Sequence, residues 1–326
     1  MERIKNYFWN AHEQRMRALW RFFMFLLAAG LLNWPMQTIT KLAMEPGVLR
    51  TSVSFFFLAI CMLGALYLVA RYVDKRPFPE FGFQMTGRWW QEFAFGAIIS
   101  IAAVTLIFYT EWANGWIEIR GTFYTKYTAI PFFLAFLSQI FRYLCGGMFE
   151  ELFSRGYMLR TIAEGMHSRR ISSKAAIITA WLITSVIFGF LHIFNPNASL
   201  IAALNLSLIG LLYGLPFVLS GRLGMSIGLH MFWNISQNNL FGFPNSGKAS
   251  NTSLLLVEQG GPEIWTGGAF GPEAGLVTTI AVLIQAAIVI WWFKYQEKEA
   301  TLETSLAMPP TLFQHNQDLE PGSKTI

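Results

Sequence analysis

About eight apolar stretches follow one another along the chain, each near the length of roughly 20 residues that a helix needs to cross a bilayer. Hydrophobic residues make up 54% of the 326 positions and charged residues only 13%, a balance that water-soluble domains of this size rarely show. The sequence therefore predicts an all-α polytopic membrane protein with about eight transmembrane helices. We expect these helices at 19–39, 52–72, 90–110, 129–147, 175–194, 200–220, 223–240 and 276–293.

Lysine and arginine residues are concentrated in alternate loops. The N-terminal segment, residues 71–80, residues 159–174, Arg222 and the C-terminal tail form the basic set, and the opposite loops hold few such residues. Under the positive-inside rule, this pattern predicts that both termini lie in the cytoplasm. The first 21 residues carry scattered charges and no cleavage site after a short apolar core, so we expect the first helix to be retained as an anchor.

The formal net charge of +5 is explained by this membrane orientation. The basic residues form no stripe on one domain of the kind that binds nucleic acid, and we exclude nucleic acid as a partner. Cys61 and Cys145 lie in apolar segments without the spacing of a metal site or a disulfide framework. This placement favours two small buried hydrophobic residues.

Composition divides the chain into four parts. Residues 1–128 hold an N-terminal cytoplasmic segment and the first three helices, and residues 129–240 hold the next four. Residues 241–295 comprise a glycine-rich loop, predicted to be extracytoplasmic, and the last helix; loops of this length are usually functional or mobile. Residues 296–326 are polar and contain proline, which predicts a largely disordered cytoplasmic tail.

A pair of adjacent glutamates, Glu150 and Glu151, directly continues the fourth apolar stretch. An uncompensated carboxylate is costly in lipid, so these charges either lie beyond the membrane or have a function. Glu151 and Arg155 are four residues apart, which places them on one helix face as a possible ion pair. Glu150 is turned about 100° away from Glu151 around the helix, so it does not share the face that pairs with Arg155 and is available for another role.

Two further polar sets lie within later apolar helices. Phe188 and His192 are four residues apart, and so are His230 and Asn234. Taken singly, the glutamates are explained as solvated interface residues, and the histidines and the amide as hydrogen-bonding groups between helices. Together they supply a base, an imidazole that can orient water and donors for an oxyanion, which are the groups that hydrolysis needs.

In this order, "EELFSR", "FGFLH" and "HMFWN" resemble the EExxxR, FxxxH and HxxxN motifs of the CAAX prenyl protease and bacteriocin-processing (CPBP) family of intramembrane proteases. Each motif alone is weak, and three in order on separate predicted helices are specific. The similarity covers roughly 136–239. It extends through "FGFPNSG" and "TGGAFGPE", which resemble one bacterial branch of the family, and the catalytic core then corresponds to residues 129–240.

The resemblance implies a helical fold with a conical, water-filled catalytic cavity that lies within the membrane and opens towards the cytoplasm. By matching position, it implies that Glu150 activates the attacking water and that His192 positions this water. His230 and Asn234 would stabilise the tetrahedral oxyanion. We expect the Glu150 end of its helix at the cytoplasmic side of the membrane.

The resemblance also implies that Glu151 supports the site through Arg155, and that Phe188 belongs to the second motif. Many family members have phenylalanine directly before the motif arginine, whereas Ser154 stands in this sequence. The motif tolerates this difference.

A metal is a second mechanistic possibility, because family members have been described both as metalloproteases and as glutamate proteases without metal. Glu150, His192 and His230 could supply three ligands to a divalent ion such as zinc, with water in the fourth place. However, the sequence has no pair of metal ligands four residues apart of the HExxH type, and Asn234 suits an oxyanion better than a zinc shell. We favour a mechanism that requires no cofactor.

The substrate class follows from the resemblance alone. We expect a membrane-associated peptide or lipidated protein, cleaved at the lipid bilayer by an integral protein of a bacterial plasma membrane. Two other functions stay open: a non-catalytic immunity or scaffold protein with the same fold, and a transporter that uses the polar residues as an ion pathway. The absence of a visible internal repeat counts against the transporter.

Overall fold

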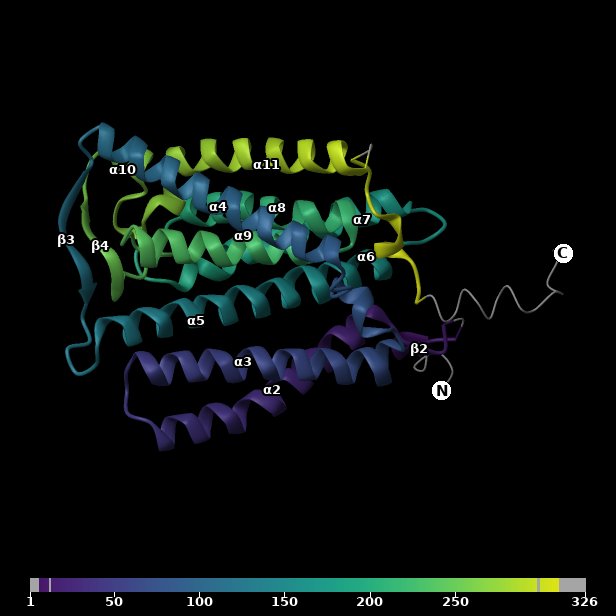
Figure 1. Ribbon diagram of the computed structural model, residues 1–326. Coiled ribbons are helices and arrows are strands. Elements are labelled where there is room, and N and C mark those ends of the chain that lie inside the picture. Colours follow the sequence, from purple (N-terminus) through teal and green to yellow (C-terminus); the bar gives the residue numbers. More distant parts are fainter. Residues whose placement is uncertain (1–5, 12, 298–299, 311–326) are drawn as a thin grey trace, which may run out of the picture.

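The computed structural model describes residues 6–11, 13–297 and 300–310, and these residues form a bundle of long helices that run roughly along one axis (Figure 1). Seven helical stretches within them are long and apolar enough to cross a membrane. Their main helices are α2 (Ala18–Ala43), α3 (Val48–Val69), α4 (Gly87–Ala113), α5 (Phe132–Glu151), α7 (Ser173–Leu191), α8 (Leu200–Ser220) and α11 (Leu276–Glu297).

The eighth expected helix is α9 (Gly224–Asn234), which continues as the π-helical segment η5 (Ile235–Leu240). It is shorter than the other seven and lies almost entirely buried inside the bundle. A Cβ atom at Gly228 would lie 2.2 Å from the carbonyl oxygen of Phe93, so only glycine lets α9 lie directly against α4. Small residues bring membrane helices together in this way. Each predicted apolar stretch is thus a helix, and the all-α polytopic fold is confirmed.

Several helices begin and end at residues that satisfy their free backbone groups. The hydroxyl groups of Thr86, Ser172 and Ser199 accept hydrogen bonds from the first turns of α4, α7 and α8, respectively. Gly221 ends α8 with a φ of 67°, a left-handed conformation that glycine adopts at little cost. These caps set the helix ends from which the connecting loops start.

The two ends of the bundle differ (Figure 1). One end, here called the ribbon end, carries the antiparallel strands β3 (Ile117–Thr125) and β4 (Thr252–Gln259) and the short helix α10 (Glu263–Thr266). The other, the terminal end, carries the start of α2, the short pair β1 (Trp9–Asn10) and β2 (Arg15–Met16), and α6 (Arg160–Met166). Both described ends of the chain lie at the terminal end.

Buried ion pairs tie the terminal end together. Glu164 of α6 accepts hydrogen bonds from Arg15, from Arg21 at 2.8 Å and from Arg76 at 3.0 Å. Arg21 also pairs with Asp74 at the end of the π-helical segment η1 (Ala70–Asp74). Because a buried charge is tolerated only when it is paired, this cluster fixes α2, η1 and α6 relative to one another.

The predicted disorder of residues 296–326 is wrong for its described part. Residues 296 and 297 belong to α11, and residues 304–307 form the 3₁₀ turn η8 (Thr304–Ala307). Leu306 and Ala307 are fully buried, and Arg160 donates a hydrogen bond to the Ser305 carbonyl at 3.2 Å. Buried apolar side chains and hydrogen bonds to the backbone, such as that from Arg76 to the Met308 carbonyl at 2.8 Å, together dock this polar segment on the bundle. Residues 298–299 and 311–326 lie outside the described residues.

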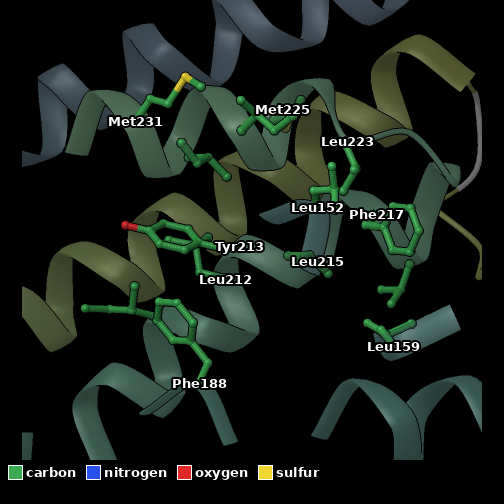
Figure 2. Close-up of a cluster of buried hydrophobic side chains, with 14 of the residues drawn as sticks. Leu152, Leu159, Phe188, Leu212, Tyr213, Leu215, Phe217, Leu223, Met225 and Met231 are labelled. Atoms are coloured by element: carbon green, nitrogen blue, oxygen red, sulfur yellow. The ribbon is translucent and has the colours of Figure 1, made fainter. Parts of the chain in front are cut away.

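A continuous hydrophobic core fills the space between η3 (Leu152–Leu159), α8 and α9 (Figure 2). Leu152, Leu212 and Leu223 are almost fully buried. Tyr213 and Phe188 lie towards one side of this cluster (Figure 2). Their rings form the border between the core and the polar site.

Candidate active site

The glutamate pair lies well inside a long helix. The helix that begins at Phe132 continues without a break through Glu151, η3 and α6 to Met166. The expectation that Glu150 stands at the end of its helix is therefore wrong, and the side of the membrane to which it is closer stays a prediction. The helix continues because both glutamates find polar partners inside the bundle, so their charges do not force it to end.

The backbone widens into a π-helix directly after Glu151, and π-helical turns are frequent at functional sites. The Ser154 hydroxyl donates a hydrogen bond to the Glu150 carbonyl, across the start of this π-helix. This contact gives Ser154 a structural role at the position where many family members have phenylalanine.

Glu151 and Arg155 form the predicted ion pair. Arg155 Nη1 lies 2.8 Å from Glu151 Oε1, and both side chains are buried. Arg155 also donates to the Gly210 carbonyl at 2.7 Å, and its guanidinium carbon lies 4.8 Å from the centroid of the Phe188 ring. Arg155 thus links three helices. Glu151 Oε1 is committed to Arg155 and His230, and its Oε2 is buried without a hydrogen-bond partner among the described residues.

His230 is held between the two glutamates. Its Nδ1 lies 2.8 Å from Glu151 Oε1, and its Nε2 lies 3.6 Å from Glu150 Oε2. Tyr213 stacks on the imidazole at a centroid distance of 4.7 Å, and Phe188 meets it edge-on at 5.8 Å. These contacts fix the ring so that only Nε2 faces Glu150.

The approach of α5 to α9 depends on Gly147. A Cβ atom at this position would lie 2.8 Å from the Met231 side chain and 3.2 Å from the Met231 backbone nitrogen. The missing side chain therefore brings the glutamate pair within reach of His230.

His192 lies at the end of α7, as the first residue of the 3₁₀ turn η4 (His192–Phe194). Its Nδ1 lies 2.7 Å from the Phe188 carbonyl oxygen. A carbonyl only accepts hydrogen bonds, so Nδ1 carries a hydrogen and Nε2 is left as the free ring nitrogen. The two rings of the Phe188 and His192 pair pack at a centroid distance of 5.0 Å, as their spacing predicts.

A small polar cavity joins these groups. Glu150, His192, His230 and Asn234 all line it, and its volume of about 80 Å³ has room for a few water molecules. The side chain of Glu150 is 33% exposed, whereas that of Glu151 is fully buried. The structure thus brings together the four residues that the sequence singles out, with Glu150 as the accessible carboxylate.

Sequence reasoning missed several other residues of this cavity. They come from α5, from the turn after α7 and from the glycine-rich loop, and they include Arg142, Asn195, Asn245, Ser246, Lys248 and Glu273. Asn245 and Glu273 lie in the segments "FGFPNSG" and "TGGAFGPE". The available signals were the resemblance of both segments to a bacterial branch of the family and a lone acid among turn-forming residues, and neither reveals that the loop folds inward.

Two loop segments meet Asn234 in the cavity. Asn245 Nδ2 donates to Asn234 Oδ1 at 3.0 Å and to Glu273 Oε1 at 3.3 Å. Ser246 donates to Glu273 Oε2 from its backbone nitrogen and from its hydroxyl. Burial raises the pKa of the Glu273 carboxyl, and the Ser246 donors counteract this rise by stabilising the charged form.

Turn and loop residues line one side of the cavity, among them Asn195, Ser246 and Lys248. The polar loop takes this place because its side chains find hydrogen-bond partners at the ends of α7 and α9. The opening towards the cytoplasm, which the resemblance implies, stays a prediction.

A second, more apolar groove reaches the same glutamate from the side. It has a volume of about 330 Å³ and lies between α5, η3 and α7, where Phe149, Phe153 and Leu191 line it together with Glu150 and His192. Leu191 is 57% exposed on the outer surface of the bundle. A membrane-embedded chain therefore has an apolar route to Glu150.

The donor set does not fit a metal centre. Within residues 6–11, 13–297 and 300–310, no group of three or more histidine, cysteine, aspartate or glutamate side chains is arranged to hold a metal ion. His230 and Glu150 approach each other with Nε2 and Oε2 at 3.6 Å, and no third ligand completes the set. We therefore derive no step through a metal.

The apolar helical bundle defines the class of the protein as an integral membrane protein. Within it, residues 130–236 match the family model described as "Type II CAAX prenyl endopeptidase Rce1-like". This segment is about a third of the chain and holds Glu150, His192, His230 and Asn234, so the resemblance to the CPBP family of proteases is confirmed. No curated protein and no solved structure matches the chain significantly.

Proposed function

We propose that this protein is an intramembrane endopeptidase in which Glu150 is the general base. One observation carries the proposal. The accessible carboxylate, two imidazoles and an amide that the three motifs supply line one small cavity, within the segment that matches a protease family. Hydrolysis of a peptide bond needs this combination of groups within reach of one water molecule.

The roles of the two glutamates follow from their contacts. Glu151 is buried against Arg155 and His230, so it orients these residues. Glu150 is free to take a proton from a water molecule that the free Nε2 of His192 holds. The water oxygen attacks the substrate carbonyl carbon and forms the new C–O bond. The C–N bond then breaks, and Glu150 returns the proton to the leaving amine.

Negative charge that develops on the carbonyl oxygen needs donors. His230 Nε2 and the Asn234 amide line the cavity beside Glu150. Glu151 Oε1 lies 2.8 Å from Nδ1 and Glu150 Oε2 lies 3.6 Å from Nε2, and an imidazole with a hydrogen on each nitrogen can donate on both sides. Loss of one such donor typically lowers kcat by about 10²–10³-fold.

The apolar side groove supports a membrane-associated peptide or lipidated protein as substrate. Its aromatic and aliphatic walls suit a lipid chain or an apolar helix, and it ends at Glu150 and His192. The matching family is described as a CAAX prenyl endopeptidase. For this chain, we infer the broader class of substrate in a bacterial plasma membrane.

The test compares new peptide termini in membranes that contain the wild type, Glu150→Gln or Glu263→Gln at matched levels. Glu263 lies in the exposed helix α10 and controls for the loss of a charge. Mass spectrometry should find the same new termini with the wild type and Glu263→Gln, and none with Glu150→Gln. Addition of 1,10-phenanthroline should leave these termini unchanged.

The other possible functions give different results. If all three proteins produce the same termini as membranes without the protein, the chain is not a protease. A phenotype that Glu150→Gln still rescues would then favour the scaffold, and flux that depends on a proton gradient would favour the transporter.

A further inference from the structure

A second carboxylate faces the cavity from outside the segment that matches the family. Glu273 belongs to the 3₁₀ turn η7 (Pro272–Ala274), is 3% exposed and lines the cavity together with Asn234. It is not part of any of the three motifs. Its buried position needs an explanation, because a buried carboxylate is costly without partners.

The partners of Glu273 form a chain of hydrogen bonds that ends at Asn234. Ser246 donates twice to Oε2, and Asn245 Nδ2 donates to Oε1 at 3.3 Å. The same Nδ2 group donates to Asn234 Oδ1 at 3.0 Å. The Asn245 amide therefore bridges the carboxylate and the motif asparagine.

This chain has a defined polarity. An ionised carboxylate only accepts hydrogen bonds, whereas an amide nitrogen carries two hydrogens. Because Glu273 can only accept, Asn245 must turn its Nδ2 towards Glu273. The second hydrogen of this Nδ2 then needs an acceptor, so Asn234 must turn its Oδ1 towards Asn245. The Nδ2 of Asn234 is then left for the cavity.

We propose that Glu273 and Asn245 are positioning residues that hold the Asn234 amide with its donor nitrogen towards the substrate oxyanion. The inference rests on the proposed function. Without this chain, the amide of Asn234 can rotate and place an oxygen beside the developing negative charge, which would oppose the reaction.

The surrounding loop is fastened in a way that suits this task. Asn195, at the end of α7, donates to the Ser246 carbonyl at 3.0 Å, and Gln237 of η5 donates to the Pro244 carbonyl at 2.6 Å. Gly247 has a φ of 80°, and a Cβ atom there would lie 1.9 Å from the Pro196 carbonyl oxygen. The segment that carries Asn245 is thus held on both sides, as precise orientation of a side chain requires.

The decisive variant is Asn245→Asp, which keeps size and shape but replaces the donor by an acceptor. Asn234 must then turn its Nδ2 towards residue 245 and its oxygen towards the cavity. We expect kcat to fall by about 10²–10³-fold, with KM changed less than about threefold because binding of the ground state is spared. The probe is an internally quenched peptide that spans the cut site found in the membrane experiment.

Two further variants separate positioning from a general structural role. In Glu273→Gln, the glutamine oxygen accepts from the Ser246 donors, so its amide nitrogen faces Asn245. Asn245 must then turn its oxygen towards residue 273, which reverses the donors and acceptors along the chain. We therefore expect kcat to fall as in Asn245→Asp. In an Asn234→Ala background, Asn245→Asp should cause no further fall, because groups that act through one another are not additive. Asn251→Asp, in the same loop but outside the cavity, is the matched control.

The outcomes distinguish the two proposals. Wild-type activity in Asn245→Asp or in Glu273→Gln overturns the positioning role and leaves the endopeptidase intact. An equal fall caused by Asn245→Asp with and without Asn234 also overturns it, because that result indicates loop distortion. If the wild type cleaves no faster than Glu150→Gln, the proposed function itself fails.

Discussion

At the scale of single residues, the site combines one accessible carboxylate, Glu150, with two that are committed to partners. Glu151 is bound by Arg155 and His230, and Glu273 is bound by Ser246 and Asn245. Inside a membrane protein, a carboxylate survives only with such partners. The partners therefore serve catalysis indirectly, because they leave Glu150 as the residue that can exchange a proton.

The Arg155 guanidinium donates to both Glu151 and the Gly210 carbonyl, and this double contact can be tested. Arg155→Lys keeps the charge, but a lysine cannot reach both Glu151 and the Gly210 carbonyl. We expect a loss of about 1–3 kcal/mol in unfolding free energy, because one buried acceptor is left without a donor, and a fall in kcat of tenfold or more. Thermal unfolding in detergent and cleavage of the quenched peptide measure the two effects.

Arg120→Lys is the matched control. Arg120 is 48% exposed and pairs with Glu118 and Glu258 on the ribbon, and surface pairs contribute little to stability. Equal stability losses for the two lysine variants would contradict the role assigned to Arg155.

At the scale of helices, close packing positions the motifs. Gly147 lets α5 approach α9, and Gly228 lets α9 approach α4. The two motif helices change to π-helix directly after Glu151 and Asn234. The glutamate pair and Asn234 thus each lie directly before a segment of π-helix, and close packing against neighbouring helices holds these segments in place.

Gly147→Ala tests this packing. The new methyl group would meet Met231 at 2.8 Å, so we expect α5 and α9 to separate at a cost of about 1–3 kcal/mol and kcat to fall with it. Gly30→Ala in α2 is the control, since its methyl group meets nothing within 4 Å. Better helix propensity should make this control neutral or stabilising by about 0.5–1 kcal/mol. A neutral Gly147→Ala would show that α5 can move without cost.

The apolar pattern of the sequence was sufficient to predict all eight helices, because each one faces lipid or core along most of its length. It did not predict that the helix of Glu150 continues to Met166. The polar side chains of that stretch look like a helix end, and their partners, such as His230 and Arg21, are distant in sequence. Pairing between distant residues is invisible to a local pattern.

At the scale of the whole molecule, the terminal end and the ribbon end differ in their content of basic residues. Arg15, Arg160 and Arg170 belong to the terminal end, whereas the ribbon end has few basic residues.

The three motifs predicted four residues of the site correctly as neighbours. They could not predict Asn245 and Glu273, because a loop rich in glycine gives no periodic signal of where it folds.

The orientation in the membrane can be tested with single cysteines. Lys126→Cys at the ribbon end and Arg170→Cys at the terminal end introduce exposed thiols, and the native Cys61 and Cys145 are buried. A maleimide that cannot cross membranes should label Lys126→Cys in whole cells, but Arg170→Cys only after lysis. The reverse pattern would place the termini outside the cytoplasm.

The size of the cavity has a consequence for how turnover is controlled. A space of about 80 Å³ holds water but no peptide, since pockets for organic ligands span about 300–1,000 Å³. A scissile bond can reach His230 and Asn234, which line this cavity but not the side groove, only when the walls part, and the side groove between α5 and α7 is where an apolar chain meets these walls. Entry to the cavity then selects substrates before the chemical step, because membrane proteins that cannot separate these helices remain uncut.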